Sequence, residues 1–280
     1  MGEIKVGTSG FQFQDWKGSV YPPGLPDRDM LGYYERVFGF NVLEVNYTYY
    51  RIPSAAAMER MLAKTSEAFD FVVRSYSGMT HEIWADEGRK VLKDTSSIFR
   101  QFRNGLSPMR EAGRLGCVLI QFPSFFWPGE AHRDYIERCR DWLAGIPLVI
   151  EFRNKAWVHE STFNFLRDHN VGFCAVDEPA LPRLMPFVPQ VTTSIGYVRL
   201  HGRNTKWFSV SREERYNYLY SEAELASFVT PVRQIGEKTV KTYVFFNNCH
   251  AGHAVKNALM FKKMLGMITT PNQQQESLIS

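Results

Sequence analysis

Eight short segments of apolar, β-branched or aromatic residues alternate with helical patterns along the chain, and this alternation constrains the fold more than any other feature. Most of the segments are near-continuous hydrophobic runs, which is typical of parallel strands covered on both faces. The expected strands are 4–10, 41–46, 69–75, 116–122, 147–153, 172–177, 196–202 and 242–248.

The segments between these strands carry helical patterns in most cases. Gly39 is a natural stop for the first helix, and Ser54 and Ser221 are good N-caps for two later ones. Strands that alternate with helices indicate βαβ units, and eight units in about 250 residues predict a (β/α)8 TIM-type barrel. A doubly wound open sheet is the alternative. The expected helices are 29–38, 54–68, 94–112, 131–144, 160–169, 221–235 and 253–266.

One connection departs from the alternation. Residues 178–194 contain several prolines, so an irregular connection between the sixth and seventh strands is expected in place of a helix. We expect one TIM-barrel domain over residues 1–268, because no linker interrupts the pattern. Residues 269–280 are expected to form a polar, frayed C-terminal tail.

The charge balance and the cysteines narrow the class of protein. A net charge of +4 permits an anionic ligand, but no run of Lys and Arg marks a strong nucleic-acid binder. No stretch approaches the roughly 18 apolar residues that a membrane span needs, and the first residues lack a signal-peptide pattern. The four cysteines are widely separated, without zinc-site spacing, which favours reduced core thiols. The expected location is the cytoplasm, with no membrane partner.

Polar residues lie near the C-terminal end of every expected strand. Residues two apart on a strand point to the same face, so each of three polar pairs is expected to point into the barrel at its C-terminal mouth. Active sites of this fold lie there. The alternative is a buried ion-pair layer that fixes the strand register without chemistry. The pairs are Glu44 with Asn46, Glu151 with Arg153, and Arg199 with His201.

Glu44 is the clearest case, because it interrupts an apolar run, and a buried carboxylate needs a partner. The expected partner is Arg74 on the neighbouring strand, or Arg199 or His201 across the barrel.

Aromatic residues follow several of the strands. Trp16, Tyr49, Trp157 and Trp207 fall in the expected loops of the mouth, where flat rings can stack on sugars or bases, although each could equally be a packing anchor. Arginines supply forked donors that suit phosphate or carboxylate. Together they favour an anionic ligand with a planar or sugar part, such as a phosphosugar, a nucleotide, or flipped or single-stranded nucleic acid.

A bound metal is left open. His81 and His201 could join Glu44, Glu151 and Asp177 in a mixed nitrogen and oxygen site, but no HxH or HExxH spacing supports a divalent metal. The "CHAGH" segment, 249–253, precedes the last expected helix and is interpreted as a loop or capping segment.

Seven sequence blocks stand out in order along the chain. They are "GTSGFQFQDWKGSVYP" (7–22), "EVNYTYYRIP" (44–53), "MTH" (79–81), "QFPSFF" (121–126), "EFRNKAW" (151–157), "YVRLHGR" (197–203) and "FNNCHAGHAVKNA" (245–257). Together they resemble the YecE-like family, a widespread group catalogued as a domain of unknown function. The resemblance spans about residues 4–265 and implies a TIM-type barrel, but no settled activity. Arg74 stands where the family commonly has Lys, and Asn154 and Ala156 stand where it has His and Ser. Phe11 replaces a usual Trp, and the block after the fourth strand has one proline where two are typical.

The leading hypothesis is an enzyme with its site at the mouth, most simply a hydrolase of a phosphoester or glycosidic bond. Burial and nearby arginines can give two carboxylates different pKa values, so Glu44 and Glu151 are the best candidates for a general acid and a general base. A phosphosugar isomerase or lyase, and a non-catalytic nucleotide or nucleic-acid binding protein, are the alternatives. The catalytic candidates are Glu44, Glu151, His201 and Asp177; the binding candidates are Asn46, Arg74, Gln121, Arg153, Arg199, Asn247, Asn248, Trp16, Tyr49, Trp157 and Trp207.

Overall fold

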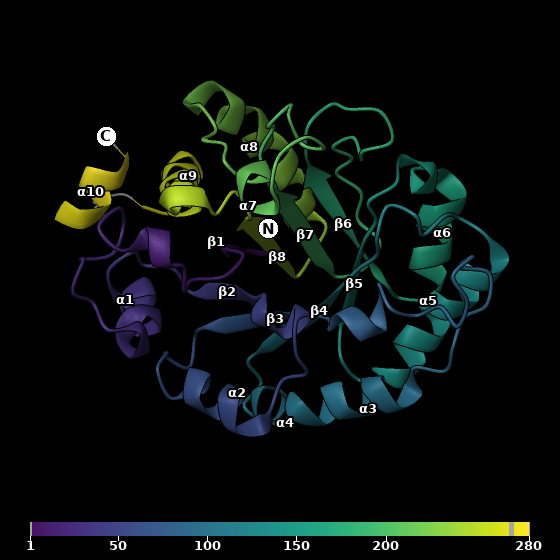
Figure 1. Cartoon of the computed structure of the whole chain (residues 1–280). Coiled ribbons are helices and arrows are strands. Elements are labelled where there is room, and N and C mark those ends of the chain that lie inside the picture. The colour runs from purple at the N-terminus through teal and green to yellow at the C-terminus, as the bar shows by residue number, and fades with distance from the viewer. Residues whose placement is uncertain (1, 269–271, 280) are drawn as a thin grey trace.

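The computed structural model describes residues 2–268 and 272–279, and its centre is a ring of eight parallel strands with helices outside (Figure 1). The expected barrel is therefore confirmed. The strands are β1 (Glu3–Thr8), β2 (Val42–Val45), β3 (Asp70–Arg74), β4 (Leu115–Gln121), β5 (Leu148–Glu151), β6 (Gly172–Asp177), β7 (Ile195–Leu200) and β8 (Lys241–Phe246). The α-helices are α1 (Met30–Arg36), α2 (Ala55–Leu62), α3 (Ser96–Gly105), α4 (Ser107–Glu111), α5 (Glu130–Trp142), α6 (Glu160–Asp168), α7 (Arg212–Arg215), α8 (Glu222–Glu237), α9 (His253–Met264) and α10 (Gln273–Ile279).

The strand order excludes a doubly wound sheet. From β2 to β8 each strand pairs in parallel with the next one in the sequence, and β8 pairs with β1. The ring closes between β1 and β2 through one bridge, Ser9 with Glu44, where the Gly10 amide donates to the Glu44 carbonyl at 2.9 Å. The carboxyl ends of all eight strands therefore meet at one end of the barrel, which we call the mouth.

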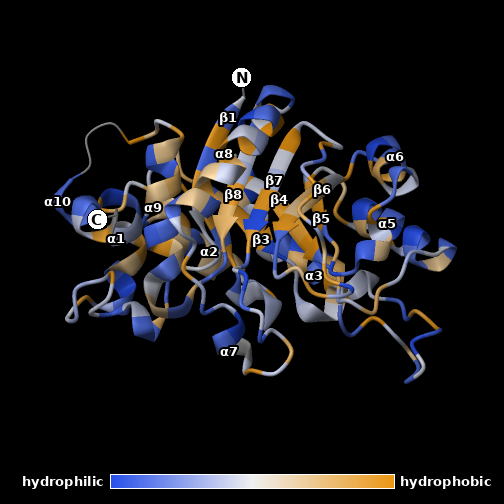
Figure 2. Ribbon diagram, turned by 90° about the horizontal axis from the view of Figure 1, so that it is seen from above, coloured by the Kyte–Doolittle hydropathy of each residue, from blue (hydrophilic) through white to orange (hydrophobic). Residues whose placement is uncertain are grey.

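The strands are covered on both faces, as their hydrophobic runs predicted. All six residues of β6 and all five of β3 are buried. Figure 2 shows the hydrophobic strands at the centre and polar residues on the outer helices. No helix among residues 2–268 and 272–279 is long and apolar enough to cross a membrane.

Most helices lie within the expected ranges, and prolines account for the main departures. The segment 94–112 forms two helices, because Pro108 lacks the N–H that a continuous helix requires and instead occupies the first turn of α4. Residues 178–194 contain no helix, which confirms the irregular connection. Ser221 caps α8 with a capping box to Glu224, as its position suggested.

The expected polar tail falls partly on residues 269–271 and 280, which lie outside the described part of the chain. Its remaining residues form α10, which lies beside α9 and is not frayed (Figure 1). The Gln275 amide donates to the Phe38 carbonyl at 2.9 Å, and Asn272 donates to the Val37 carbonyl at 2.8 Å. These side-chain amides satisfy carbonyls at the end of α1, and Leu278 is buried.

A salt-bridged group lies at the end of the barrel opposite the mouth. The Asp70 carboxylate, at the start of β3, accepts from Lys241 at 2.7 Å and from the Tyr243 hydroxyl at 2.9 Å. The Lys5 ammonium lies 3.1 Å from the same oxygen. Asp70 points inside the barrel, so Arg74, four residues later on β3, is on the same inner face at the mouth.

Candidate functional site

Arg199 on β7 is the partner of the two buried glutamates. Its guanidinium points into the barrel and donates to Glu44 at 2.7 Å and to Glu151 at 2.5 Å. The second oxygen of Glu44 accepts from the Tyr197 hydroxyl at 2.6 Å, and Gln121 accepts from Arg199 at 3.3 Å. Arg199 and both glutamates are fully buried. One cation therefore joins carboxylates from β2 and β5, and it is one of the partners expected for Glu44.

Arg153 extends this group toward the Pro-rich connection. Its guanidinium contacts the free oxygen of Glu151 and donates to Glu178 at 2.7 Å. Burial by itself raises the pKa of the Glu151 carboxyl, but Arg153 and Arg199 lower that pKa well below its usual range. Glu151 is therefore held ionised and has no proton to give. Glu178 was not a sequence candidate; its only signal was a carboxylate directly after β6.

His201 is fully buried beside Glu151. Its Nδ1 lies 2.9 Å from the Asn247 amide nitrogen, and its Nε2 lies 3.3 Å from a Glu151 oxygen. An amide nitrogen can only donate, so Nδ1 accepts, and the hydrogen on Nε2 faces the carboxylate. Burial and the charges of Arg153 and Arg199 lower the pKa of His201 to about 3. The imidazole is therefore neutral near pH 7.

Arg74 differs from the other two arginines because its charge is unpaired. It is 8% exposed, and its guanidinium carbon lies 4.1 Å from the centre of the Tyr49 ring. Within residues 2–268 and 272–279, no group accepts a hydrogen bond from Arg74 and no carboxylate lies within 4.0 Å. Burial and the charge of Arg199 lower the pKa of Arg74 to about 10. The expected pairing of Arg74 with Glu44 is wrong, because Arg199 takes that carboxylate.

We call Glu44, Glu151, Arg153, Arg199 and His201 the mouth cluster. Three further residues lie around it. Asn46 follows β2, and its buried oxygen has no hydrogen-bond partner among the described residues. Tyr216, from the connection between β7 and α8, has its ring centre 6.2 Å from that of His201 and 5.5 Å from that of Trp207.

Asp177 and Asn248 lie outside the mouth cluster. Both oxygens of Asp177 accept from Arg203, at 2.8 to 3.1 Å, and one also accepts from the Tyr220 hydroxyl at 2.6 Å. Asn248 donates to the Tyr218 carbonyl at 2.8 Å. These contacts fix the ends of the β7–α8 connection. Both oxygens of Asp177 are thus engaged by protein groups, and its place among the catalytic candidates stays a prediction that these contacts do not support.

Trp16 and Trp157 are packed as anchors, which is the alternative that the sequence left open for them, and a contact with a ligand stays a prediction. Both are fully buried. The Trp16 indole donates to the Cys249 carbonyl at 2.6 Å, and the Trp157 indole donates to the Phe126 carbonyl at 2.7 Å. Trp157 also stacks on Phe152, whose side chain faces the helices. Trp16 packs against Phe13 and Tyr21, so the hydrophobic effect holds both rings among other aromatic side chains.

The residues considered for a metal do not form a metal site, although Glu44, Glu151 and His201 all belong to the mouth cluster. Among the described residues, no three His, Cys, Asp or Glu side chains lie close enough to hold a metal ion. Asp177 is bound by Arg203, and the His81 ring lies 5.1 Å from that of Tyr49. In the "CHAGH" segment, His253 is the first residue of α9.

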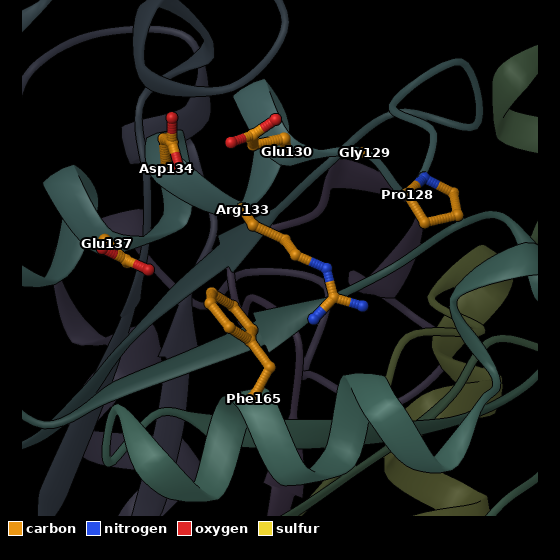
Figure 3. Close-up of a pocket in the computed structure, with 7 residues that line it drawn as sticks. All are labelled: Pro128, Gly129, Glu130, Arg133, Asp134, Glu137 and Phe165. Carbon is orange, nitrogen blue, oxygen red and sulfur yellow. The ribbon is translucent and has the colours of Figure 1, made fainter.

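A hollow of about 540 Å³ lies on the outer wall between α5 and α6, away from the mouth. Figure 3 shows acidic side chains of α5, including Asp134 and Glu137, and Phe165 on the facing helix. Arg133 lies with its guanidinium carbon 5.0 Å from the Phe165 ring centre. The charged side chains of this hollow are exposed or half-buried, and the mouth remains the better candidate because it contains a buried cation without a carboxylate partner.

Comparisons with known proteins agree with the resemblance seen in the sequence. Residues 5–277 match the family model "Protein of unknown function DUF72". The UPF0759 protein YunF of Bacillus subtilis (strain 168) is 29% identical over 277 residues, which are 95% of this chain and 94% of YunF. A DUF72 family protein of Thermotoga maritima MSB8 has a crystal structure that matches with a TM-score of 0.87 and 44% identity, over 94% of this chain and 99% of that one. A DUF72 family protein of Enterococcus faecalis V583 matches with a TM-score of 0.81 and 26% identity, over 96% and 98% of the two chains.

Proposed function

The chain belongs to the DUF72 family of proteins of unknown function, and from that premise we propose that its barrel mouth binds the anionic group of a sugar- or nucleotide-like molecule. The unpaired Arg74 guanidinium is the observation that carries this proposal. A buried charge without a partner is costly, so its retention is explained best by a ligand that supplies the missing negative charge. A forked guanidinium suits a phosphate or a carboxylate.

The surroundings of Arg74 support a ligand with a flat or ring-shaped body. The Tyr49 ring lies against the guanidinium, and Trp207 and Tyr216 contribute further aromatic faces near His201. Aromatic side chains stack on sugars and bases. The unsatisfied oxygen of Asn46 is available to accept from a ligand hydroxyl or amino group.

His201 is the best candidate for proton transfer. It is neutral near pH 7, and Glu151 faces its Nε2. For Nδ1 to accept a proton, the Asn247 amide that donates to it at 2.9 Å has to move away when the ligand binds, and Glu151 would then stabilise the imidazolium. We propose hydrolysis of a phosphoester or glycosidic bond. Water adds to the phosphorus or the anomeric carbon, the bond to the leaving oxygen breaks, and His201 passes the water's proton to that oxygen. An anionic ligand beside Arg153 would raise the pKa of His201 toward the working pH, where a general base is most effective.

A non-catalytic binding protein is the second candidate, and one observation favours it. Arg199 occupies an oxygen of each of Glu44 and Glu151, so neither carboxylate is positioned as a free acid. In this case the pocket would recognise its ligand without changing it. The free cysteines, all buried, support the expected reducing cytoplasmic location for either function.

Binding and turnover of a phosphosugar and nucleotide panel test the proposal. We expect calorimetry to show that Arg74→Gln binds the panel's ligands at least tenfold more weakly than the wild type, because the two arginines of the mouth cluster, Arg153 and Arg199, are already paired with carboxylates. Arg140→Gln is the matched control, since Arg140 is on α5 and bonds only to Asp141 at the surface. Unchanged binding by Arg74→Gln would contradict the proposal.

His201→Gln separates the two candidate functions. A hydrolase keeps its ligand affinity in this variant and loses turnover by about 10²- to 10⁴-fold, as expected when a general base is removed. A binding protein shows no turnover in the wild type, and its affinity changes little.

A further inference from the structure

The backbone of Arg74 is fixed on both sides, although no carboxylate of the described residues pairs with its side chain. The Arg74 carbonyl accepts from the hydroxyl of Thr48 at 2.5 Å, and Thr48 is fully buried in the turn that follows β2. The amide of Ser75, the next residue, donates to the Leu119 carbonyl on β4 at 2.9 Å. The direction of the Arg74 charge is therefore set by what its side chain contacts.

The Tyr49 ring is the printed side-chain contact of Arg74. The guanidinium carbon lies 4.1 Å from the centre of this ring, within the range of a cation–π contact. The attraction stabilises the charge but supplies no acceptor oxygen, so the N–H donors of Arg74 still lack partners among the described residues.

Tyr49 is itself held by the loop after β3. Its ring meets the His81 ring at 5.1 Å and close to a right angle. The Nδ1 of His81 lies 2.9 Å from the hydroxyl of Thr80, which is fully buried. In the chain Tyr49 follows Thr48, whose hydroxyl holds the end of β3. Contacts from the loops after β2 and β3 thus fix the ring against which Arg74 lies.

The three nitrogens of the Arg74 guanidinium differ in access. Nε is enclosed and has no hydrogen-bond partner in the described ranges 2–268 and 272–279. The two terminal nitrogens also lack a partner in these ranges, but they are not enclosed, in keeping with the 8% exposure of the residue. An anion therefore reaches Arg74 from the end of the guanidinium, where two N–H groups suit two oxygens of one phosphate or carboxylate.

We propose that Tyr49 is a positioning residue of the anion site, which fixes the Arg74 guanidinium so that its two terminal nitrogens meet two oxygens of one anionic group. The inference rests on the proposed function, because it takes anion binding at Arg74 as given. It gives Tyr49 a role that acts through Arg74, in place of stacking on the ligand. An arginine that is oriented before binding loses less side-chain entropy when the ligand arrives, so Tyr49 strengthens binding.

Inorganic phosphate tests this role on the full-length protein, because phosphate has the oxygens but no ring on which an aromatic side chain could stack. We expect Tyr49→Leu to bind phosphate about tenfold more weakly than the wild type in calorimetric titrations, since the cation–π contact is lost. Tyr49→Phe keeps the ring and should bind within about twofold of the wild type. An equal loss in both variants would contradict a role of the ring.

Tyr33→Leu is the matched control. Tyr33 is on the outer helix α1, where its ring packs against those of Tyr21 and Phe38. The same substitution there removes a partly buried tyrosine without touching the mouth, so phosphate affinity should equal that of the wild type. A loss like that of Tyr49→Leu would mean that the effect comes from general destabilisation.

Arg74→Lys separates orientation from charge. Lysine keeps the positive charge but has one ammonium in place of the fork, so this variant should bind phosphate more weakly than the wild type. Its affinity should change little when Tyr49→Leu is added, because no fork remains to be oriented. An equal tenfold loss from Tyr49→Leu in both backgrounds would overturn the inference.

The NMR signal of the Arg74 guanidinium gives a test that does not depend on the folding of a Tyr49 variant. The signal is identified by its absence in Arg74→Gln. The ring current of Tyr49 should shift it upfield, and the shift should persist when phosphate binds, because the contact is kept in the complex. Loss of the shift on addition of phosphate would mean that Arg74 leaves Tyr49 to meet the anion, which contradicts a positioning role.

Failure of this inference is distinct from failure of the proposed function. If Tyr49→Leu binds phosphate like the wild type while Arg74→Gln loses binding, Tyr49 has no positioning role and the proposed function stands. The same holds if nucleotides or phosphosugars bind and phosphate does not, since contacts with the rest of the ligand then decide binding. If the wild type binds neither phosphate nor the phosphosugar and nucleotide panel, the proposed function fails and this inference fails with it.

Discussion

At the scale of single residues, the mouth cluster contains buried arginines that need a carboxylate and buried glutamates that need a cation. Arg199 bonds to Glu44 and Glu151, and Arg153 joins Glu151 to Glu178. Removing one partner of such a group leaves an uncompensated buried charge, which costs about 3–5 kcal/mol. The cluster therefore fixes the relative positions of β2, β5 and β7 whether or not it performs chemistry.

His201 makes the stability of the protein depend on pH. Its pKa is about 3 in the folded chain and about 6.5 in an unfolded one, so between these values the unfolded state binds the additional proton. The free energy of unfolding therefore falls as pH drops from 6.5 toward 3. The contribution of His201 to this loss at pH 5 is about 2 kcal/mol.

Urea unfolding at pH 7 and pH 5 measures this loss. We expect the wild type to lose about 2 kcal/mol more than His201→Gln over this interval, since the variant has no imidazole to protonate. Comparing the two proteins cancels the other titrating groups, including His253. Equal losses in both proteins would show that His201 titrates normally in the folded state.

The sequence predicts the members of the mouth cluster better than their partners. The two-residue spacing placed Arg199 with His201 and Glu151 with Arg153 on inner faces, because strand geometry alone determines it. Which carboxylate Arg199 would join depends on how strands pack across the barrel, and spacing does not encode that. Tyr216 was missed because its position depends on the path of a long loop.

At the scale of whole elements, residues close together in the sequence predicted the strands and the helix caps. The structure of the C-terminal segment depends instead on contacts with residues far away in the sequence. Ser221 caps α8 because its partner, Glu224, is three residues away. The polar composition of 272–279 gave no sign of a helix, because the stabilising groups are carbonyls of Val37 and Phe38, more than two hundred residues earlier. Sequence patterns of this length cannot reveal such a partner.

The packing of α10 predicts a measurable contribution from one apolar residue. We expect Leu278→Ala to lower the free energy of unfolding by about 2 kcal/mol, because Leu278 is buried where α10 meets the barrel. Ser277→Ala is the neighbouring control; Ser277 is exposed, and its change should stay within about 0.5 kcal/mol. Equal urea midpoints for the two variants would mean that α10 is not packed in solution.

At the scale of the whole molecule, the two ends of the barrel have different roles. β3 shows this in a single strand, because it begins at Asp70 and ends at Arg74 on the same inner face. Asp70 pairs with Lys5 and Lys241, whereas Arg74 has no carboxylate partner among the described residues. In TIM barrels the N-terminal face generally contributes stability and the C-terminal face contributes function.

A pair of substitutions on β3 tests this division. Asp70→Asn should lower the free energy of unfolding by about 3 kcal/mol, because it removes the nearest carboxylate of Lys5 and Lys241 and leaves them only Glu3 at 3.7 Å, and should keep phosphate affinity. Arg74→Gln should lose phosphate affinity and match or exceed the wild-type stability, because it removes an unpaired buried charge. Thermal melts and calorimetry on both variants measure the two effects. A large loss of stability in Arg74→Gln would indicate a structural role instead.

The closure of the barrel also determines when its first strand can be built. β1 pairs over six residues with β8, from Glu3 with Lys241 to Thr8 with Phe246, but meets β2 through one bridge at Ser9. During synthesis on the ribosome, β1 emerges before the other strands and then lacks its main neighbour until β8 has been made. Such long-range pairing slows folding and leaves a strand edge exposed to association with other chains. A ribosome-bound nascent chain that ends before β8 therefore has an incomplete ring and an unassembled site.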